Sequence, residues 1–352
     1  MQTAVDTAGE TPTRQLLMKI FEGRVDLEGI ERIQTPLPFP PSHINSYVIP
    51  GRETVLIDTG IKTEAAWKAL NEGLAAIGLK ITDIRHLLVT HGHIDHFGQA
   101  KRIQDASGCH IYAHELERYH MEANFQERST PDSPIFEFFQ EWGVEKELVE
   151  RAFSGQRAEG VVRDNVKIDH AWTDGEVLQF PQVRLKCIWV PGHAVGHTVL
   201  LEEQRGILFS ADHLLPDISP VPLLNFPDAS KKEKTRSLVD YVQSLYKVRN
   251  LAVTVALPSH GEPIPDIRAL IDSYALHRNR RYLKIRNILE EKGPMTAYQV
   301  SEHVFNPDRA KMLMHLTMSE TVGFLELLEA DGILKIEKRD GLLYYSIRPD
   351  AG

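Results

Sequence analysis

Four side chains that can bind a metal ion lie within six positions of this chain: His91, His93, Asp95 and His96. They directly follow residues 84–89, a mostly apolar run that is typical of a buried strand. In an extended or tightly looped backbone, residues two apart point the same way, so His91 and His93 can face one cation while Asp95 and His96 face a second. A single histidine is more often structural, but packing does not explain four such groups together. The spacing therefore predicts a two-metal site, with ions roughly 3.5–4 Å apart.

Length and composition favour a globular protein. With 352 residues and 42% hydrophobic side chains, the chain can form one large domain and a smaller one. No apolar run approaches the eighteen or so residues of a membrane-spanning helix, and the N-terminus lacks the basic-then-apolar order of a signal peptide. We therefore expect a soluble, cytoplasmic protein with no membrane partner. The two cysteines, Cys109 and Cys187, lie far apart, which predicts buried thiols in strands rather than a disulfide framework.

Strands and helices alternate along most of the chain, which favours an α/β layer architecture. Residues up to about Gln15 are polar and small, which predicts a flexible N-terminus over residues 1–19, whereas residues 20–277 form the expected main domain. After the first metal cluster, strands are expected at residues 109–112, 166–168, 176–180, 183–189, 198–201, 206–210 and 253–257, and a helix at 230–248.

A helical insert at residues 115–160 interrupts this alternation. Its main helix is expected over residues 135–153, and it carries Phe136, Phe139 and Trp142 among other apolar side chains. The insert is either a lid over a pocket or a helical pair that caps the core.

Three later segments each place one more metal-binding side chain at the end of an expected strand. His193 follows the Pro191-Gly192 turn, where the backbone is fixed and the imidazole can be aimed. Asp212 lies just after the apolar run of residues 206–210, and His260 lies just after that of residues 253–257. Because α/β folds gather functional groups at the ends of neighbouring strands, these side chains are expected near the first cluster.

The ordered motifs resemble the metallo-β-lactamase-fold hydrolases and are similar to glyoxalase II and its relatives. The resemblance rests on His-x-His-x-Asp-His at residues 91–96, Pro-Gly-His at 191–193, an aspartate after an apolar strand at 212, and Ser-His-Gly at 259–261. It covers about residues 20–275. It implies a four-layer αββα sandwich with the site at one edge of the paired sheets, and it makes residues 20–277 the catalytic domain.

The resemblance also implies a role for each candidate residue. His91, His93 and His193 would hold one metal, Asp95, His96 and His260 would hold the other, and Asp212 would bridge the two. Asp58 matches the family's aspartate that supports the metal loop from outside the ligands. Two features depart from the pattern: Ala211 stands where the family more often has glycine, and His197 and His213 lie beside expected ligands. Asp95, as a ligand rather than a general base, and His197, as a hydrogen-bonding neighbour of the ligands, are the candidate catalytic side chains.

Five histidines and two carboxylates suit two Zn²⁺ ions, although ligand type also admits iron or manganese. A water between two dications loses its proton near neutral pH, which predicts a metal-bridging hydroxide that attacks a small ester, thioester or lactone. Two other activities stay open: phosphodiester hydrolysis of single-stranded RNA, and the chemistry of sulfur dioxygenases, which use one iron in this fold. A noncatalytic regulator is disfavoured because the ligand set is full.

Residues 278–352 predict three helices and a hairpin, which resemble the winged-helix domain appended to some lactamase-like hydrolases. The helix that would enter a nucleic-acid groove, at residues 319–329, carries Glu320, Glu326 and Glu329 and no Lys or Arg. Together with the net charge of −9, this disfavours nucleic acid as a partner. A small-molecule substrate and a homodimer are the expected partners. The basic stripe Arg278, Arg280, Arg281, Lys284 and Arg286 is the counter-evidence, and it is also consistent with binding of an anionic substrate tail.

Overall fold

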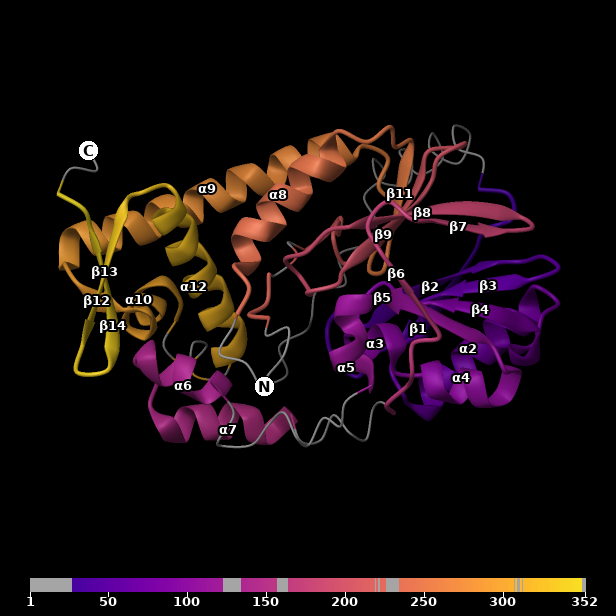
Figure 1. The fold of residues 1–352 in the computed structure, drawn as a ribbon, viewed down its shortest axis with the longest axis horizontal. Coiled ribbons are helices and arrows are strands. Elements are labelled where there is room, and N and C mark those ends of the chain that lie inside the picture. The colour runs from indigo at the N-terminus through magenta and orange to yellow at the C-terminus, as the bar shows by residue number, and fades with distance from the viewer. Residues whose placement is uncertain are drawn as a thin grey trace, which may run out of the picture.

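The computed structural model describes residues 27–122, 134–156, 164–218, 220, 222–225, 234–306, 308, 311 and 313–349. The predicted flexible N-terminus at residues 1–19 lies outside them, as do residues 123–133 and 157–160 of the predicted insert. Two packed sheets with flanking helices form one end of the molecule, and the C-terminal helices form the other (Figure 1).

The first sheet contains, within the described residues, six strands in the spatial order β1-β2-β3-β4-β5-β6. They are β1 (Glu31–Pro36), β2 (His43–Ile49), β3 (Thr54–Ile57), β4 (Ile84–Leu88), β5 (His110–His114) and β6 (His170–Trp172). Strands β3 to β6 run parallel to one another. Since parallel strands end at the same edge, the residues that follow β3 and β4 are brought side by side there.

The second sheet has the order β11-β10-β9-β8-β7. Its strands are β7 (Val177–Phe180), β8 (Val183–Trp189), β9 (Thr198–Glu202), β10 (Ile207–Ala211) and β11 (Val255–Pro258). The strand predicted at residues 166–168 is wrong, because Val166 and Ile168 are buried in an extended connection and pairing with β5 begins only at His170. Apolar side chains can be buried without a ladder, and the sequence pattern does not separate the two cases.

Helices cover the outer faces of both sheets. They are α2 (Glu64–Ala76), α3 (Ile94–Phe97), α4 (Ala100–Ser107), α5 (Arg118–Glu122) and α8 (Ser237–Arg249), with short 3₁₀ turns at Ile81–Asp83 and Glu115–Glu117. Leu56 of β3 packs with Leu70 of α2, whereas its neighbour Ile57 packs with Phe209 between the sheets. Leu245 of α8 packs against the outer face of the second sheet. The predicted αββα layers are therefore confirmed.

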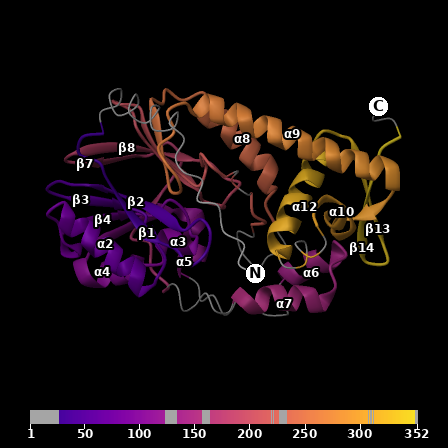
Figure 2. The ribbon, with the colours of Figure 1, turned by 180° about the vertical axis from the view of Figure 1, so that it is seen from behind.

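The C-terminal region consists of three helices and a small sheet in its described residues. These elements are α9 (Ile267–Lys292), β12 (Met295–Thr296), α10 (Ala297–Val304), α12 (Met314–Ala330), β13 (Leu334–Arg339) and β14 (Leu342–Ile347). The predicted helices and hairpin are present, and α12 begins before the expected residue 319. Helix α9 runs unbroken through residues 277 and 278, so it joins the sheets to this region (Figures 1 and 2). The winged-helix assignment stays a prediction.

The insert forms two helices, α6 (Pro134–Glu141) and α7 (Lys146–Gln156), instead of the single helix predicted over residues 135–153. Gly143, with a φ of +84°, ends the first helix. Phe139 and Trp142 are buried in one core with Val300 and Leu328 of the C-terminal region, and the Trp142 carbonyl accepts a hydrogen bond from the Tyr298 amide at 3.0 Å. These aromatic side chains therefore dock the insert onto the C-terminal region and leave none of their surface for an apolar substrate.

Candidate metal centre

All seven predicted metal ligands converge at one edge of the paired sheets. His91, His93, Asp95 and His96 follow β4, while His193, Asp212 and His260 follow β8, β10 and β11. Their donor atoms form two groups, each with all atoms within 4.8 Å of one another. The first group is His91, His93, His193 and Asp212, and the second is Asp95, His96 and His260. Both groups agree with the ligand sets that the resemblance implied.

The first group aims three imidazole nitrogens at one point. His93 Nδ1 lies 2.9 Å from His91 Nε2 and 3.0 Å from His193 Nε2. Nitrogen ligands at tetrahedral positions around a zinc ion are about 3.3 Å apart, given Zn–N bonds of about 2.0–2.1 Å. Burial lowers the pKa of His91 and of His93 well below the usual value for histidine, and the neighbouring histidines lower both further. The two rings are therefore neutral and can donate a lone pair to a cation.

Asp212 lies between the two groups. Its Oδ2 is 3.3 Å from His193 Nε2 of the first group. Its Oδ1 is 3.5 Å from His96 Nε2 and 3.6 Å from His260 Nε2 of the second group. Asp95 Oδ2 completes the second group, 3.5 Å from His260 Nε2. One carboxylate thus presents an oxygen to each group, which is the arrangement expected of a bridging ligand.

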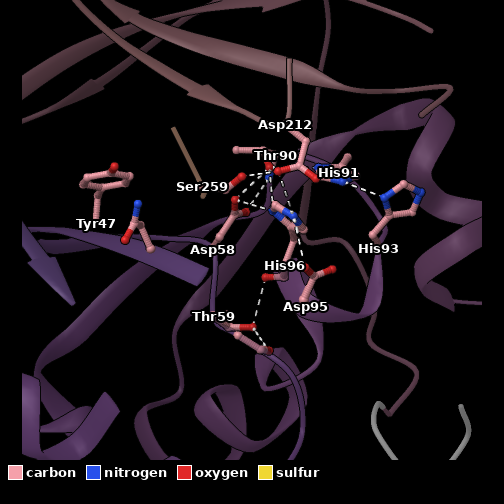
Figure 3. A network of polar contacts seen from close by, with 12 residues as sticks. Tyr47, Asp58, Thr59, Thr90, His91, His93, Asp95, His96, Asp212 and Ser259 are labelled. Carbon is pink, nitrogen blue, oxygen red and sulfur yellow. Dashed lines mark hydrogen bonds and ion pairs between the residues drawn. The ribbon is translucent and has the colours of Figure 1, made fainter. Parts of the chain in front are cut away.

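Asp58 fixes the ring of His96 from outside the ligands, as predicted (Figure 3). His96 Nδ1 donates to Asp58 Oδ2 at 2.8 Å, and the same carboxylate accepts from the Thr90 amide and hydroxyl at 2.9 and 2.8 Å. Burial alone would lower the pKa of His96, but the surrounding carboxylates, led by Asp212 and Asp58, outweigh it and raise that pKa well above its usual value. The negative potential at this ring is what a bound cation would neutralise.

Two further contacts aim the remaining ligands. His260 Nδ1 donates to the His43 carbonyl oxygen at 2.7 Å, which leaves Nε2 facing the site. The Ser259 hydroxyl donates to Asp212 Oδ1. Asp212 follows Ala211, whose φ of +45° is in the left-handed region. Glycine adopts this conformation without the penalty that a Cβ brings, which accounts for the glycine that the family more often has there.

Glu117 holds the two histidine loops together, and sequence reasoning missed it. Its side chain is 1% exposed. Oε2 accepts a hydrogen bond from the Gly92 amide at 3.0 Å, and Oε1 accepts one from the Gly196 amide at 2.6 Å. Gly92 stands between His91 and His93, and Gly196 follows three residues after His193. Nothing in the local sequence distinguishes Glu117 from its exposed neighbour Glu115.

His197 and His213 join neither ligand group. Both are fully buried, and neither nitrogen of the His197 ring has a hydrogen-bond partner among the described residues. The hydrogen bond predicted for His197 is therefore not seen, although its ring centroid lies 4.6 Å from that of His91. Cys187 is buried in β8, and Cys109 is buried immediately before β5.

The donor set fits divalent cations. His96 Nε2 is buried and has no hydrogen-bond partner in the described part of the chain, while Asp58 holds the opposite ring nitrogen as the donor. This nitrogen therefore faces the ligand cluster, where a bound cation would take the place of its proton. Imidazole and carboxylate donors in this ratio suit zinc.

Comparisons with known proteins place the chain in a family. Residues 39–260 match the metallo-beta-lactamase superfamily. The chain is 32% identical over 319 residues to "Probable metallo-hydrolase YqjP" of Bacillus subtilis (strain 168), covering 86% of this chain and 93% of that protein. It is 22% identical over 305 residues to the "Atrochrysone carboxyl ACP thioesterase" of Aspergillus fumigatus, covering 80% of this chain and 78% of that one. A metallo-beta-lactamase family protein of Thermus thermophilus superposes with a TM-score of 0.74 at 27% identity, covering 92% of this chain and 99% of that one. The chain belongs to the metallo-beta-lactamase superfamily and is a metal-dependent hydrolase.

Proposed function

We propose that this hydrolase holds two Zn²⁺ ions and cleaves a small ester, thioester or lactone, with a thioester as the first choice. The observation that carries the proposal is the position of Asp212, whose two oxygens face the two ligand groups. Two such cations, held by these ligand groups, would supply a water of lowered pKa and would polarise a substrate carbonyl group.

The protein's own residues hold the ligand side chains in fixed positions and protonation states. Neutral His91 and His93 offer lone pairs, while Asp58 keeps His96 in the tautomer with Nε2 inward. Glu117 sets the distance between the two histidine loops. Because these positions are fixed before substrate binds, the reacting carbonyl meets a preorganised site, which is the main requirement of electrostatic catalysis.

Thioester is preferred because one curated relative is named an ACP thioesterase. Single-stranded RNA is less favoured, because two of the five side chains of the basic stripe that could bind it are paired with carboxylates of the protein. Arg281 pairs with Glu320 at 2.8 Å, and Arg286 pairs with Glu290 at 2.7 Å. A phosphate backbone is bound by Lys and Arg that are available to replace counterions.

A metal analysis and a substrate panel test the proposal. Zinc-loaded protein should contain about two zinc ions per chain and should turn over a thioester or lactone faster than a phosphodiester or a β-lactam. His93→Ala should abolish this turnover with the fold kept, whereas His110→Ala, at an exposed histidine on β5, should not. One iron per chain with oxygen uptake would instead establish the dioxygenase, and a salt-dependent shift on single-stranded RNA with cleavage would establish the nuclease.

A further inference from the structure

A cavity of about 490 Å³ lies where α8, α9 and α12 meet residues 216–218, 220 and 222. The three helices pack together where the C-terminal region joins the rest of the molecule (Figures 1 and 2). Its walls combine apolar surface from Leu238, Phe324, Tyr241 and Tyr274 with the side chain of Arg278. This volume and this mixture of apolar walls with a few polar groups are typical of small-molecule sites.

Arg278 is the unusual group in this cavity. It is half-buried, and burial lowers its pKa below the usual value for arginine, yet the guanidinium stays charged. No carboxylate among the described residues pairs with it, whereas Arg281, which also lines the cavity, is paired with Glu320. A desolvated charge without a partner is costly, so an anion bound in the cavity would be strongly favoured.

The cavity is joined to the metal centre by the segment that follows Asp212. The Tyr241 hydroxyl donates to the His213 carbonyl at 2.9 Å, and the Tyr274 hydroxyl bonds to the backbone of Leu215. Pro216 of the cavity wall lies against the turn that carries His260, because a Cβ at Gly261 would stand 2.7 Å from Pro216 Cγ.

A second cavity, of about 220 Å³, includes His260 among its lining residues and shares Asp217 and Ile218 with the first. The two cavities are therefore neighbours, and the larger one lies next to a cavity that one of the candidate ligands lines.

We propose that the larger cavity binds the anionic end of the substrate, a carboxylate or a phosphate that is joined by an apolar chain to the carbonyl group cleaved at the metal centre. The apolar chain would lie against the tyrosines, and Arg278 would pair with the anion. The identity of the cleaved bond rests on the proposed function, but the anion site itself does not.

Two matched pairs of substrates test the proposal on the zinc-loaded protein. In the first pair, the acyl chain of a thioester ends in a carboxylate or in its methyl ester. In the second pair, S-acetylpantetheine carries a phosphate or lacks it. The wild type should prefer the anionic member of one pair, which identifies the source of the anion. Arg278→Gln should raise KM for that member about 10–100-fold, the loss expected of a charge-assisted hydrogen bond, and should leave its kcat and the neutral substrate unchanged.

Arg280→Gln is the matched control, since Arg280 is an exposed arginine on the same helix that does not line the cavity. Arg278→Lys should keep most of the preference, because it keeps the positive charge. Indifference of the wild type to the terminal charge in both pairs would overturn the proposal, as would an equal effect of Arg278→Gln and Arg280→Gln.

A binding measurement separates this inference from the proposed function. Calorimetric titration of the zinc-loaded protein with n-hexyl phosphate and with hexanoate should show binding of at least one ligand that Arg278→Gln weakens about tenfold or more and Arg280→Gln does not. This result without turnover of any thioester, ester or lactone would overturn the proposed function and support the anion site. Equal binding by all three proteins would overturn the anion site.

Discussion

The carboxylate of Glu117 lies so close to the backbone of Gly92 that a Cβ atom at position 92 would stand 2.6 Å from Glu117 Oε2. A Cβ at Gly196 would stand 2.8 Å from Glu117 Cγ. Both loops that carry the three-histidine group therefore approach one buried side chain as closely as glycine allows. The glycine within the His91-Gly92-His93 motif has a structural cause, which is room for this carboxylate.

Removal of the Glu117 carboxylate should weaken metal binding. Glu117→Ala leaves two buried amide groups without an acceptor, so we expect a loss of about 2–6 kcal/mol in the free energy of unfolding, at about 1–3 kcal/mol for each group. Zinc affinity, measured by competition with a chromogenic chelator, should also fall in this variant. Glu115→Ala is the control, because Glu115 is exposed and bonds to Arg118. Unchanged zinc affinity in Glu117→Ala would show that the loops hold their spacing without it.

Asp58→Asn should affect one metal more than the other. An amide removes the charge beside His96 and allows the ring to change tautomer, and loss of such a partner typically lowers metal affinity about 10–100-fold. We expect the ion held by Asp95, His96 and His260 to be lost first in a stepwise chelator titration. Asp105→Asn, at an exposed residue paired with Lys101, should behave as the wild type. Equal weakening of both ions would contradict the role of Asp58 as the residue that orients His96 of the second group.

Gly143→Ala should loosen the contact between the insert and the C-terminal region. Gly143 has a φ of +84°, and a Cβ there would stand 2.6 Å from Thr296 Oγ1, which caps α10. Gly108→Ala measures the backbone cost alone, because Gly108 has a φ of +69° and a Cβ there would meet no atom of the described residues within 4 Å. Each substitution costs about 1 kcal/mol for the left-handed backbone, and Gly143→Ala should cost more by the clash with the cap. Urea unfolding of the two variants gives the difference, and equal losses would show that Thr296 moves aside freely.

Protonation of His114 should destabilise the fold at mildly acidic pH. His114 Nδ1 accepts a hydrogen bond from the Leu116 amide at 3.2 Å, and burial lowers the pKa of His114 below its usual value near 6.5. Below pH 6.5 the unfolded chain binds a proton that the folded chain does not, so this residue makes the free energy of unfolding fall as the pH falls. His114→Asn keeps an acceptor at the helix N-cap and removes the proton. Its unfolding free energy, followed by urea titration from pH 7 to pH 5, should fall less steeply than that of the wild type, and parallel curves would contradict the expectation.

The ligand set could be predicted because each ligand is marked by local sequence. His91 to His96 directly follow β4, His193 follows a Pro-Gly turn, and Asp212 and His260 end apolar strands. The cap of α10 is equally local, since Thr296 and Gln299 form a capping box three residues apart. The extent of the insert helices was less accessible, because apolar spacing continued across Gly143 and only its backbone conformation separates α6 from α7.

The sequence by itself determined the chemistry of this protein: the metal-binding residues, the strands that carry them and the layered fold all follow from short-range patterns of polarity and turn residues. Only the tertiary structure decided which side chains and backbone groups contact one another across long distances in the sequence. Glu117 reaches Gly92 and Gly196 across 25 and 79 positions of sequence. The insert aromatics pack on the C-terminal region rather than over the site, and of the two cavity arginines only Arg278 lacks a carboxylate partner within the described ranges. The periodicity of apolar residues predicts which side chains are buried. The partner of a buried polar side chain depends on how distant segments of the chain pack together, and local sequence patterns do not predict that packing.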